Sequence, residues 1–266
     1  MKKQITFFFF WMAIAIGLEA EFYIYTQDVL TGSHYGIAFI CTSLLLLYVL
    51  PAVFLMRAWQ KHWHLNGLQF ILPLLSGAFI AGWLSYYGNH IVDLLLEALG
   101  VTGQLFNDLG AMSAPFIEEP AKAIAAFAAL SYLNKWRPKA VLVAGASAGL
   151  GFQIIEDFAY INQNTVEGLA YSIADIFGRM TGAISSHWVY TALFVFGLYL
   201  ILNQEHRDLK WGAIFSASAL VLHFIWNSPI LDIPTPMPLI APLIIATGLW
   251  LFYQAYHKAQ TIDTSH

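Results

Sequence analysis

Stretches of apolar residues long enough to cross a lipid bilayer recur along the whole chain. A helix rises 1.5 Å per residue and the bilayer core is about 30 Å thick, so one crossing needs about 20 apolar residues. The sequence therefore predicts an all-α, polytopic membrane protein with about eight transmembrane helices. These predicted crossings cover approximately residues 5–25, 35–57, 67–87, 109–133, 140–162, 180–202, 211–230 and 237–256.

The composition also favours a membrane protein. Hydrophobic residues make up 59% of the 266 residues and charged residues only 11%, whereas soluble domains carry about 25% charged residues. The net charge of −4 and the scattered basic residues give no sign of nucleic-acid binding. A single cysteine, Cys41, excludes an internal disulfide. We predict one integral membrane domain over residues 1–266, multi-pass in the cell inner or plasma membrane.

The basic residues predict the orientation of the chain, because Lys and Arg concentrate in cytoplasmic loops. With eight alternating crossings, nearly all of them fall on the side of both termini, which are therefore predicted to be cytoplasmic. Most acidic residues, Glu21 among them, fall on the outer side. The outer connection 88–110 has apolar residues on one face and is expected to form an amphipathic surface helix. The first crossing also has the features of a signal peptide with a cleavage site near Ala20, and this alternative stays open.

Four predicted crossings contain polar side chains that hydrocarbon normally excludes. The segment FIEEPAK places Glu118, Glu119 and Lys122 in an otherwise apolar run. The other three crossings carry Glu156, His187, His223 and Asn227. An ionisable group at membrane depth costs several kcal/mol and marks a functional site by default. Residue counts place the glutamates and histidines roughly 9–14 Å below the outer boundary, which predicts one shared site.

Weaker interpretations apply to several residues. A lone histidine or asparagine in a membrane helix often only bonds a neighbouring helix. Asp157 is expected to be solvated or to cap a helix, and Arg179 to anchor a headgroup or a loop. The motif GASAG at Gly145 to Gly149 matches the G-x-S-x-G pattern of serine hydrolases, but it lies within a predicted helix. We interpret it as a packing motif of small residues.

The predicted site favours hydrolysis by an activated water molecule. It contains no obvious Ser or Cys nucleophile, and the chain has no H-E-x-x-H motif. A glutamate beside another carboxylate is suited to take a proton from water, and His or Asn side chains donate to the oxyanion. We expect no obligatory metal and no soluble cofactor. The alternative is a zinc ion held by His187, His223 and Glu156, a three-ligand set that leaves a position open for water.

Four motifs together resemble the PrsW family of intramembrane proteases. EEPAK at Glu118 to Lys122 fits an E-E-x-x-K motif, and GLGFQIIEDFAY fits a G-F-x-x-x-E segment. His187, with Thr191 and Gly197, and HFIWN at His223 to Asn227 resemble the two histidine motifs. The resemblance covers residues 110–230, which we take as the catalytic core.

The resemblance implies a protease related to the CAAX prenyl proteases that cuts a membrane-anchored protein, such as an anti-sigma factor. By position, Glu118, Glu119 and His187 match the residues expected to be essential, with His223 and Asn227 as partners. Glu156 stands where the prenyl proteases have a histidine, so its role stays open. Two other functions remain alternatives, an ion-coupled or proton-coupled transporter and a non-proteolytic membrane scaffold. No internal repeat of the transporter kind is evident.

Overall fold

The computed structural model describes residues 2–27, 31–205, 207–233 and 239–264, and all regular secondary structure in these residues is helical. The predicted all-α class is confirmed. The long helices are α1 (Lys2–Gln27), α2 (Gly32–His62), α3 (Leu68–Ser76), α4 (Gly82–Ala98), α5 (Gly103–Leu133), α6 (Pro138–Asn164), α7 (Leu169–Gly182), α8 (His187–Leu202), α9 (Leu209–Trp226) and α10 (Ile240–Thr264). A π-helix, η1 (Gly77–Ala81), joins α3 to α4, and short 3-10 turns cover η2 (Thr165–Glu167), η3 (Ala183–Ser185) and η4 (Pro229–Asp232).

Six helical stretches in the described residues are long and apolar enough to cross a membrane. They are Gln4–Tyr23, Gly32–His62, Leu68–Ala98, Pro138–Glu167, Leu169–Leu202 and Leu209–Trp226. The two remaining predicted crossings fall in α5 and α10. Helix α5 differs from an ordinary crossing because it carries two glutamates and a lysine in its apolar middle. Part of the eighth predicted crossing, residues 237–238, lies outside the described residues.

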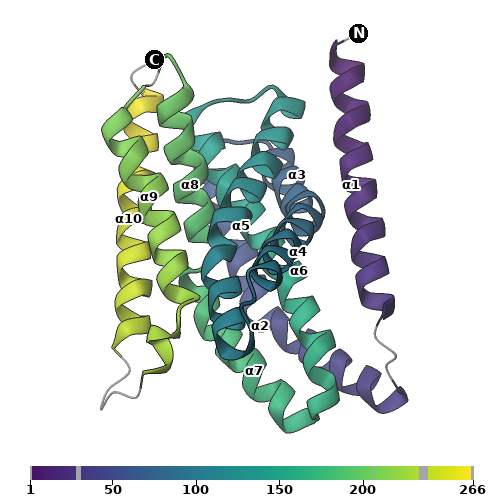
Figure 1. Cartoon of the computed structure of the whole chain (residues 1–266). Helices are drawn as coiled ribbons and strands as arrows, with labels where there is room; N and C mark the ends of the chain where they lie inside the picture. Colours follow the sequence, from purple (N-terminus) through teal and green to yellow (C-terminus); the bar gives the residue numbers. More distant parts are fainter. Residues whose placement is uncertain (1, 28–30, 206, 234–238, 265–266) are drawn as a thin grey trace.

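The bundle places α6 at its centre. Figure 1 shows α1 at one side, α8, α9 and α10 at the other, and α3 to α6 between them. Two glycines let α6 approach α8 closely: a Cβ on Gly145 would lie 2.9 Å from the Cα of Ala192, and one on Gly149 would lie 2.3 Å from the carbonyl oxygen of His187. The interpretation of GASAG as a packing motif is confirmed.

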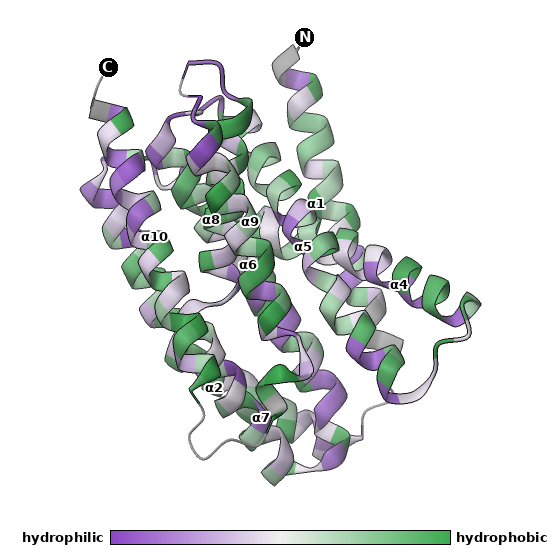
Figure 2. Ribbon diagram, turned by 60° about the vertical axis from the view of Figure 1, so that its left-hand side comes forward, coloured by the Kyte–Doolittle hydropathy of each residue, from purple (hydrophilic) through white to green (hydrophobic). Residues whose placement is uncertain are grey.

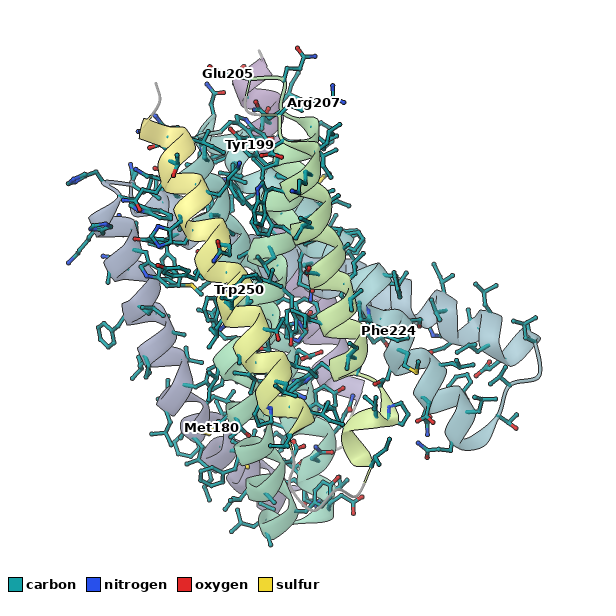
Figure 3. All side chains as sticks on the ribbon, turned by 90° about the vertical axis from the view of Figure 1, so that its left-hand side faces the viewer. Met180, Tyr199, Glu205, Arg207, Phe224 and Trp250 are labelled. Carbon is teal, nitrogen blue, oxygen red and sulfur yellow. The ribbon has the colours of Figure 1, made fainter. Side chains whose placement is uncertain are left out.

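Two sequence predictions of helix boundaries are wrong. Residues 88–110 do not form a separate surface helix, because nothing breaks α4 before Ala98; the turn comes where Gly100 and Gly103 adopt φ of +74° and +65°. Helices α4 and α5 form a hairpin that projects from the bundle (Figures 2 and 3). The predicted crossing 180–202 is also not one helix. It breaks at Ser186, which leaves helical geometry with φ −133° and ψ −130°, and α8 then begins at His187.

One end of the bundle gathers polar connections. The N-terminal end of α1 and the C-terminal end of α10 lie at this end (Figure 1), where Figure 2 shows hydrophilic connections. Figure 3 places Glu205 and Arg207 here, and Met180 of α7 toward the opposite end. Two ion pairs tie the connections to α10: Arg137 Nη2 lies 2.8 Å from Asp263, and Lys258 Nζ lies 2.6 Å from Asp208. The polar site lies away from this end, where α8 begins.

Candidate active site

Helix α5 buries three ionisable side chains within one helical turn. Glu118 is 5% exposed, and Glu119 and Lys122 are fully buried. The spacings of three and four residues turn both carboxylates toward the lysine. Lys122 Nζ lies 2.7 Å from Glu119 Oε1 and 3.2 Å from Glu118 Oε2. One ammonium group therefore offsets two carboxylates that the bilayer would otherwise exclude.

Glu119 is held by side chains from two further helices. The Thr191 hydroxyl of α8 donates to Glu119 Oε2 at 2.9 Å, and His223 Nδ1 of α9 lies 3.0 Å from Glu119 Oε1. A carboxylate only accepts hydrogen bonds when ionised, so Nδ1 of His223 carries the hydrogen. Its Nε2 is left as an acceptor, and it lies 3.8 Å from Glu118 Oε2. Glu119 thus fixes the orientation of the His223 ring.

His187, the first residue of α8, bridges α5 and α6. Its Nδ1 lies 2.8 Å from Lys122 Nζ and its Nε2 lies 3.1 Å from Glu156 Oε2. An ammonium group only donates, so Nδ1 accepts and Nε2 donates to Glu156. The helix break at Ser186 allows His187 to make both contacts, because it places the imidazole ring at the first residue of α8.

Glu156 and Asp157 are both paired with Arg179 of α7. Arg179 Nη2 donates to Glu156 Oε2 at 2.7 Å, Nε donates to Asp157 Oδ1, and the guanidinium lies 3.9 Å from the centre of the Tyr160 ring. Asp157 is fully buried and also accepts from the Tyr48 hydroxyl. The expectation that Asp157 is solvated or caps a helix is therefore wrong, because it is buried inside α6. Arg179 was expected to anchor a headgroup or a loop, and it is instead part of the site's ion-pair network. Sequence reasoning missed this because it left residues 163–179, most of α7, as a connection between two predicted crossings.

Asn227 makes no hydrogen bond to the buried cluster among the described residues. It is the C-cap of α9, and its side-chain amide donates to the Ala111 carbonyl at 3.1 Å. Asn227 follows His223 by four residues and would share its face on a continuous helix, but α9 ends at Trp226. A polar contact that the sequence did not predict comes from Asn89 of α4, whose amide lies 3.4 Å from Glu118 Oε1.

A cavity of about 950 Å³ adjoins the cluster, with walls from α1, α4, α5, α6, α7, α8 and α9. Glu118, Glu156, His187 and Asn227 line it. The other three predicted site residues are not among the described residues of its wall, namely Glu119, Lys122 and His223. Glu118 is thus the carboxylate of the E-E pair that faces the open space, and Glu119 lies behind it.

The donor atoms also allow a test of the zinc alternative. Glu118, His187 and His223 each offer one ligand atom, and these atoms all lie within 4.8 Å of one another. The predicted set had Glu156 in place of Glu118; Glu156 is instead paired with Arg179 and His187. Zinc accepts a ligand set of two imidazole nitrogens and one carboxylate oxygen. Glu119, which lies on Nδ1 of His223, is the kind of carboxylate that commonly orients a zinc-binding histidine through its other ring nitrogen. The Lys122 ammonium bonds two of these ligands, so a metal ion and Lys122 would compete for them.

A comparison with protein families decides the membership of the chain. The model of the PrsW family intramembrane metalloproteases matches residues 61–253. The chain belongs to the PrsW family. The PrsW match spans all seven predicted site residues, and together with six apolar crossings it identifies an integral membrane protein. Searches of curated proteins and of solved structures found no match.

Proposed function

We propose that this PrsW-family protein is an intramembrane endopeptidase that hydrolyses membrane-anchored proteins with a glutamate-activated water. The observation that carries this proposal is the position of Glu118, a buried carboxylate that faces the cavity while bonded to Lys122. His187 lines the same wall, and His223 Nε2 points toward the same carboxylate. The cavity thus meets a carboxylate that can act as a base and one imidazole, with a second imidazole beside the carboxylate, and these groups suit water-dependent amide hydrolysis.

In this mechanism Glu118 takes a proton from water as the water oxygen attacks the scissile carbonyl carbon. The oxyanion that forms accepts one hydrogen bond from Asn227, whose amide has a second hydrogen beyond the one given to Ala111. The proton then passes to the leaving nitrogen, the C–N bond breaks, and an acid and an amine result. Glu119, Lys122 and Glu156 act by positioning, since they hold His223, Glu118 and His187 respectively.

A zinc-dependent mechanism is the second candidate, favoured by the donor cluster of Glu118, His187 and His223. These residues would hold the ion, which when bound lowers the pKa of a bound water. Lys122 would then have to release Glu118 and His187. Chelation separates the two candidates: the glutamate mechanism predicts unchanged cleavage after metal removal, whereas loss of cleavage restored by stoichiometric zinc supports the second candidate.

The proposal includes the orientation of the protein in the membrane. Eight crossings with both termini in the cytoplasm put the basic connections at the cytoplasmic end, as the positive-inside rule expects. The cavity then opens toward the outer half of the bilayer, and the substrate is cut near its outer membrane boundary. Labelling of cysteines introduced at the exposed residues Glu205 and Glu97 tests this: position 205 should react from the cytoplasm and position 97 from outside. The reverse pattern would invert the topology.

The function itself is tested in cells that express wild-type protein or the Glu118→Gln variant. Quantitative proteomics of membrane fractions should find a single-span protein that is cut with wild type and accumulates uncut with the variant. The control is Glu97→Gln, which removes an exposed carboxylate of α4 outside the cavity wall. An ion-coupled transporter would leave every membrane protein at full length in all three strains.

A further inference from the structure

A second carboxylate faces the cavity from α1. Glu21 is 6% exposed and lines the wall, yet it has no hydrogen bond or ion pair among the described residues. Gly82, the first residue of α4, makes room for it, since a Cβ there would lie 2.5 Å from Glu21 Oε1. The proposed hydrolysis makes no use of this carboxylate.

Two buried polar groups of α4 continue the same wall. Ser85 is 2% exposed and lines the cavity, and its hydroxyl oxygen has no partner in the described structure. The side-chain oxygen of Asn89 likewise has none, although its amide nitrogen faces Glu118. Gly82, Ser85 and Asn89 follow one another at spacings of three and four residues, so they share one face of α4. A strip of unused acceptors therefore runs from Glu21 to Glu118.

The net charge of the cavity wall indicates which kind of ligand group Glu21, Ser85 and Asn89 would bind. The acidic residues that line the cavity are Glu21, Asp93, Glu118, Glu156, Asp157 and Asp175. Among the described lining residues Arg179 is the one Lys or Arg, and it is already paired with Glu156 and Asp157. A buried carboxylate without a partner is costly at membrane depth. A cation from outside the protein would offset this cost.

We infer that Glu21, Ser85 and Asn89 form a subsite that binds a lysine or arginine side chain of the substrate. The occupant is a substrate residue only if the proposed function holds; the subsite itself depends on these three residues alone. Gly82 and Asn89 are seven residues apart, which corresponds to about 10 Å along the helix. An extended peptide advances about 3.3 Å per residue, so the basic residue lies about three residues from the scissile bond.

Binding of matched peptides tests the subsite independently of cleavage. The probes are single-span peptides that carry Lys or Gln at one position, moved stepwise through the flank of the apolar segment. Their dissociation constants are measured by fluorescence anisotropy with full-length protein in lipid nanodiscs, in a Glu118→Gln background that prevents cleavage. We expect the Lys peptide to bind about tenfold more tightly than its Gln twin at one or two adjacent positions, the gain of one charge-assisted hydrogen bond.

Glu21→Gln should abolish this preference, and Glu19→Gln, an exposed carboxylate two residues away on α1, should keep it. Ser85→Ala serves as a second variant if Glu21→Gln lowers the folded yield, and it should reduce the preference. Equal binding of Lys and Gln peptides, or a preference that persists in Glu21→Gln, overturns the inference. Peptides that bind with the preference but stay uncut by the wild type contradict the proposed function and leave the subsite intact.

Discussion

Lys122 is the residue on which the polar cluster depends most. Its ammonium group contacts both glutamates of α5 and His187 of α8, and it lies 4.2 Å from the centre of the Phe152 ring. The E-E-x-x-K spacing predicted the two contacts within α5, because residues three and four apart meet on a helix. For His187, the sequence predicted only that it lies at the same membrane depth as the glutamates. The contact between Lys122 Nζ and His187 Nδ1 could not be predicted, because it depends on the helix break at Ser186.

The substitution Lys122→Met should strongly destabilise the protein, because it leaves two buried carboxylates without a counter-charge. Removal of one partner from a buried ion pair costs about 3–5 kcal/mol. The double variant Glu119→Gln/Lys122→Met should recover part of this loss, since it removes one uncompensated charge. Reversible unfolding in mixed micelles measures the free energies. If the changes in unfolding free energy of Glu119→Gln and Lys122→Met simply add in the double variant, Glu119 and Lys122 are not energetically coupled.

Sequence reasoning at the residue scale failed where a tertiary contact decided the outcome. Arg179 and Asp157 lie in different helices, and no spacing rule links them. Their pairing arises because α7 folds back against α2 and α6. The donor cluster likewise contains Glu118 and not Glu156, and no spacing rule predicts which carboxylate lies near both histidines.

The contact between α6 and α8 fixes His187 at the element scale. A methyl group on Gly149 would meet backbone atoms of His187, which cannot move as a flexible side chain can. Gly149→Ala should therefore displace the start of α8, lower the unfolding free energy by about 1–3 kcal/mol and reduce cleavage. Gly178→Ala in α7 is the matched control, because no atom lies within 4 Å of its added Cβ. Unchanged cleavage by Gly149→Ala would show that α8 is not held in place by this contact.

The start of α9 makes stability depend on pH. Asp208 caps this helix by accepting from the Trp211 backbone N–H at 3.1 Å, and the hydrogen bond from Lys258 lowers the pKa of its carboxyl group. A lowered pKa in the folded state gives stability that is present above the unfolded-state pKa of about 3.9 and is lost as pH falls through the folded-state value.

Asp208→Ala should cost about 1 kcal/mol at pH 7 through loss of the cap, and Asp208→Asn should cost less because it still caps. The advantage of the wild type over Asp208→Asn should vanish as the pH falls below about 4. Thermal unfolding in detergent across this range measures both effects. An advantage that is independent of pH would show that the pair with Lys258 does not contribute.

At the scale of the whole molecule, the lengths of the apolar stretches in the sequence predicted the helical class and most of the membrane crossings. The α4–α5 hairpin was not predicted, because its apolar residues Ile91, Leu94 and Leu95 fit either a surface helix or the extension of a crossing. The cavity could not be predicted either, since seven helices contribute to its wall. Residue counts gave a common depth for the site, but they could not place Glu21 and α4 beside it.

The central claim is that Glu118 activates the water that cuts a membrane-anchored substrate. The most direct measurement is the cleavage of the purified substrate, identified in cells, by purified enzyme in lipid nanodiscs made up in ¹⁸O-labelled water. The account predicts one labelled oxygen in the new carboxyl terminus, and at least a hundredfold slower cleavage by folded Glu118→Gln, the typical contribution of a general base. Wild-type cleavage rates in Glu118→Gln, or a new terminus without the label, would contradict it.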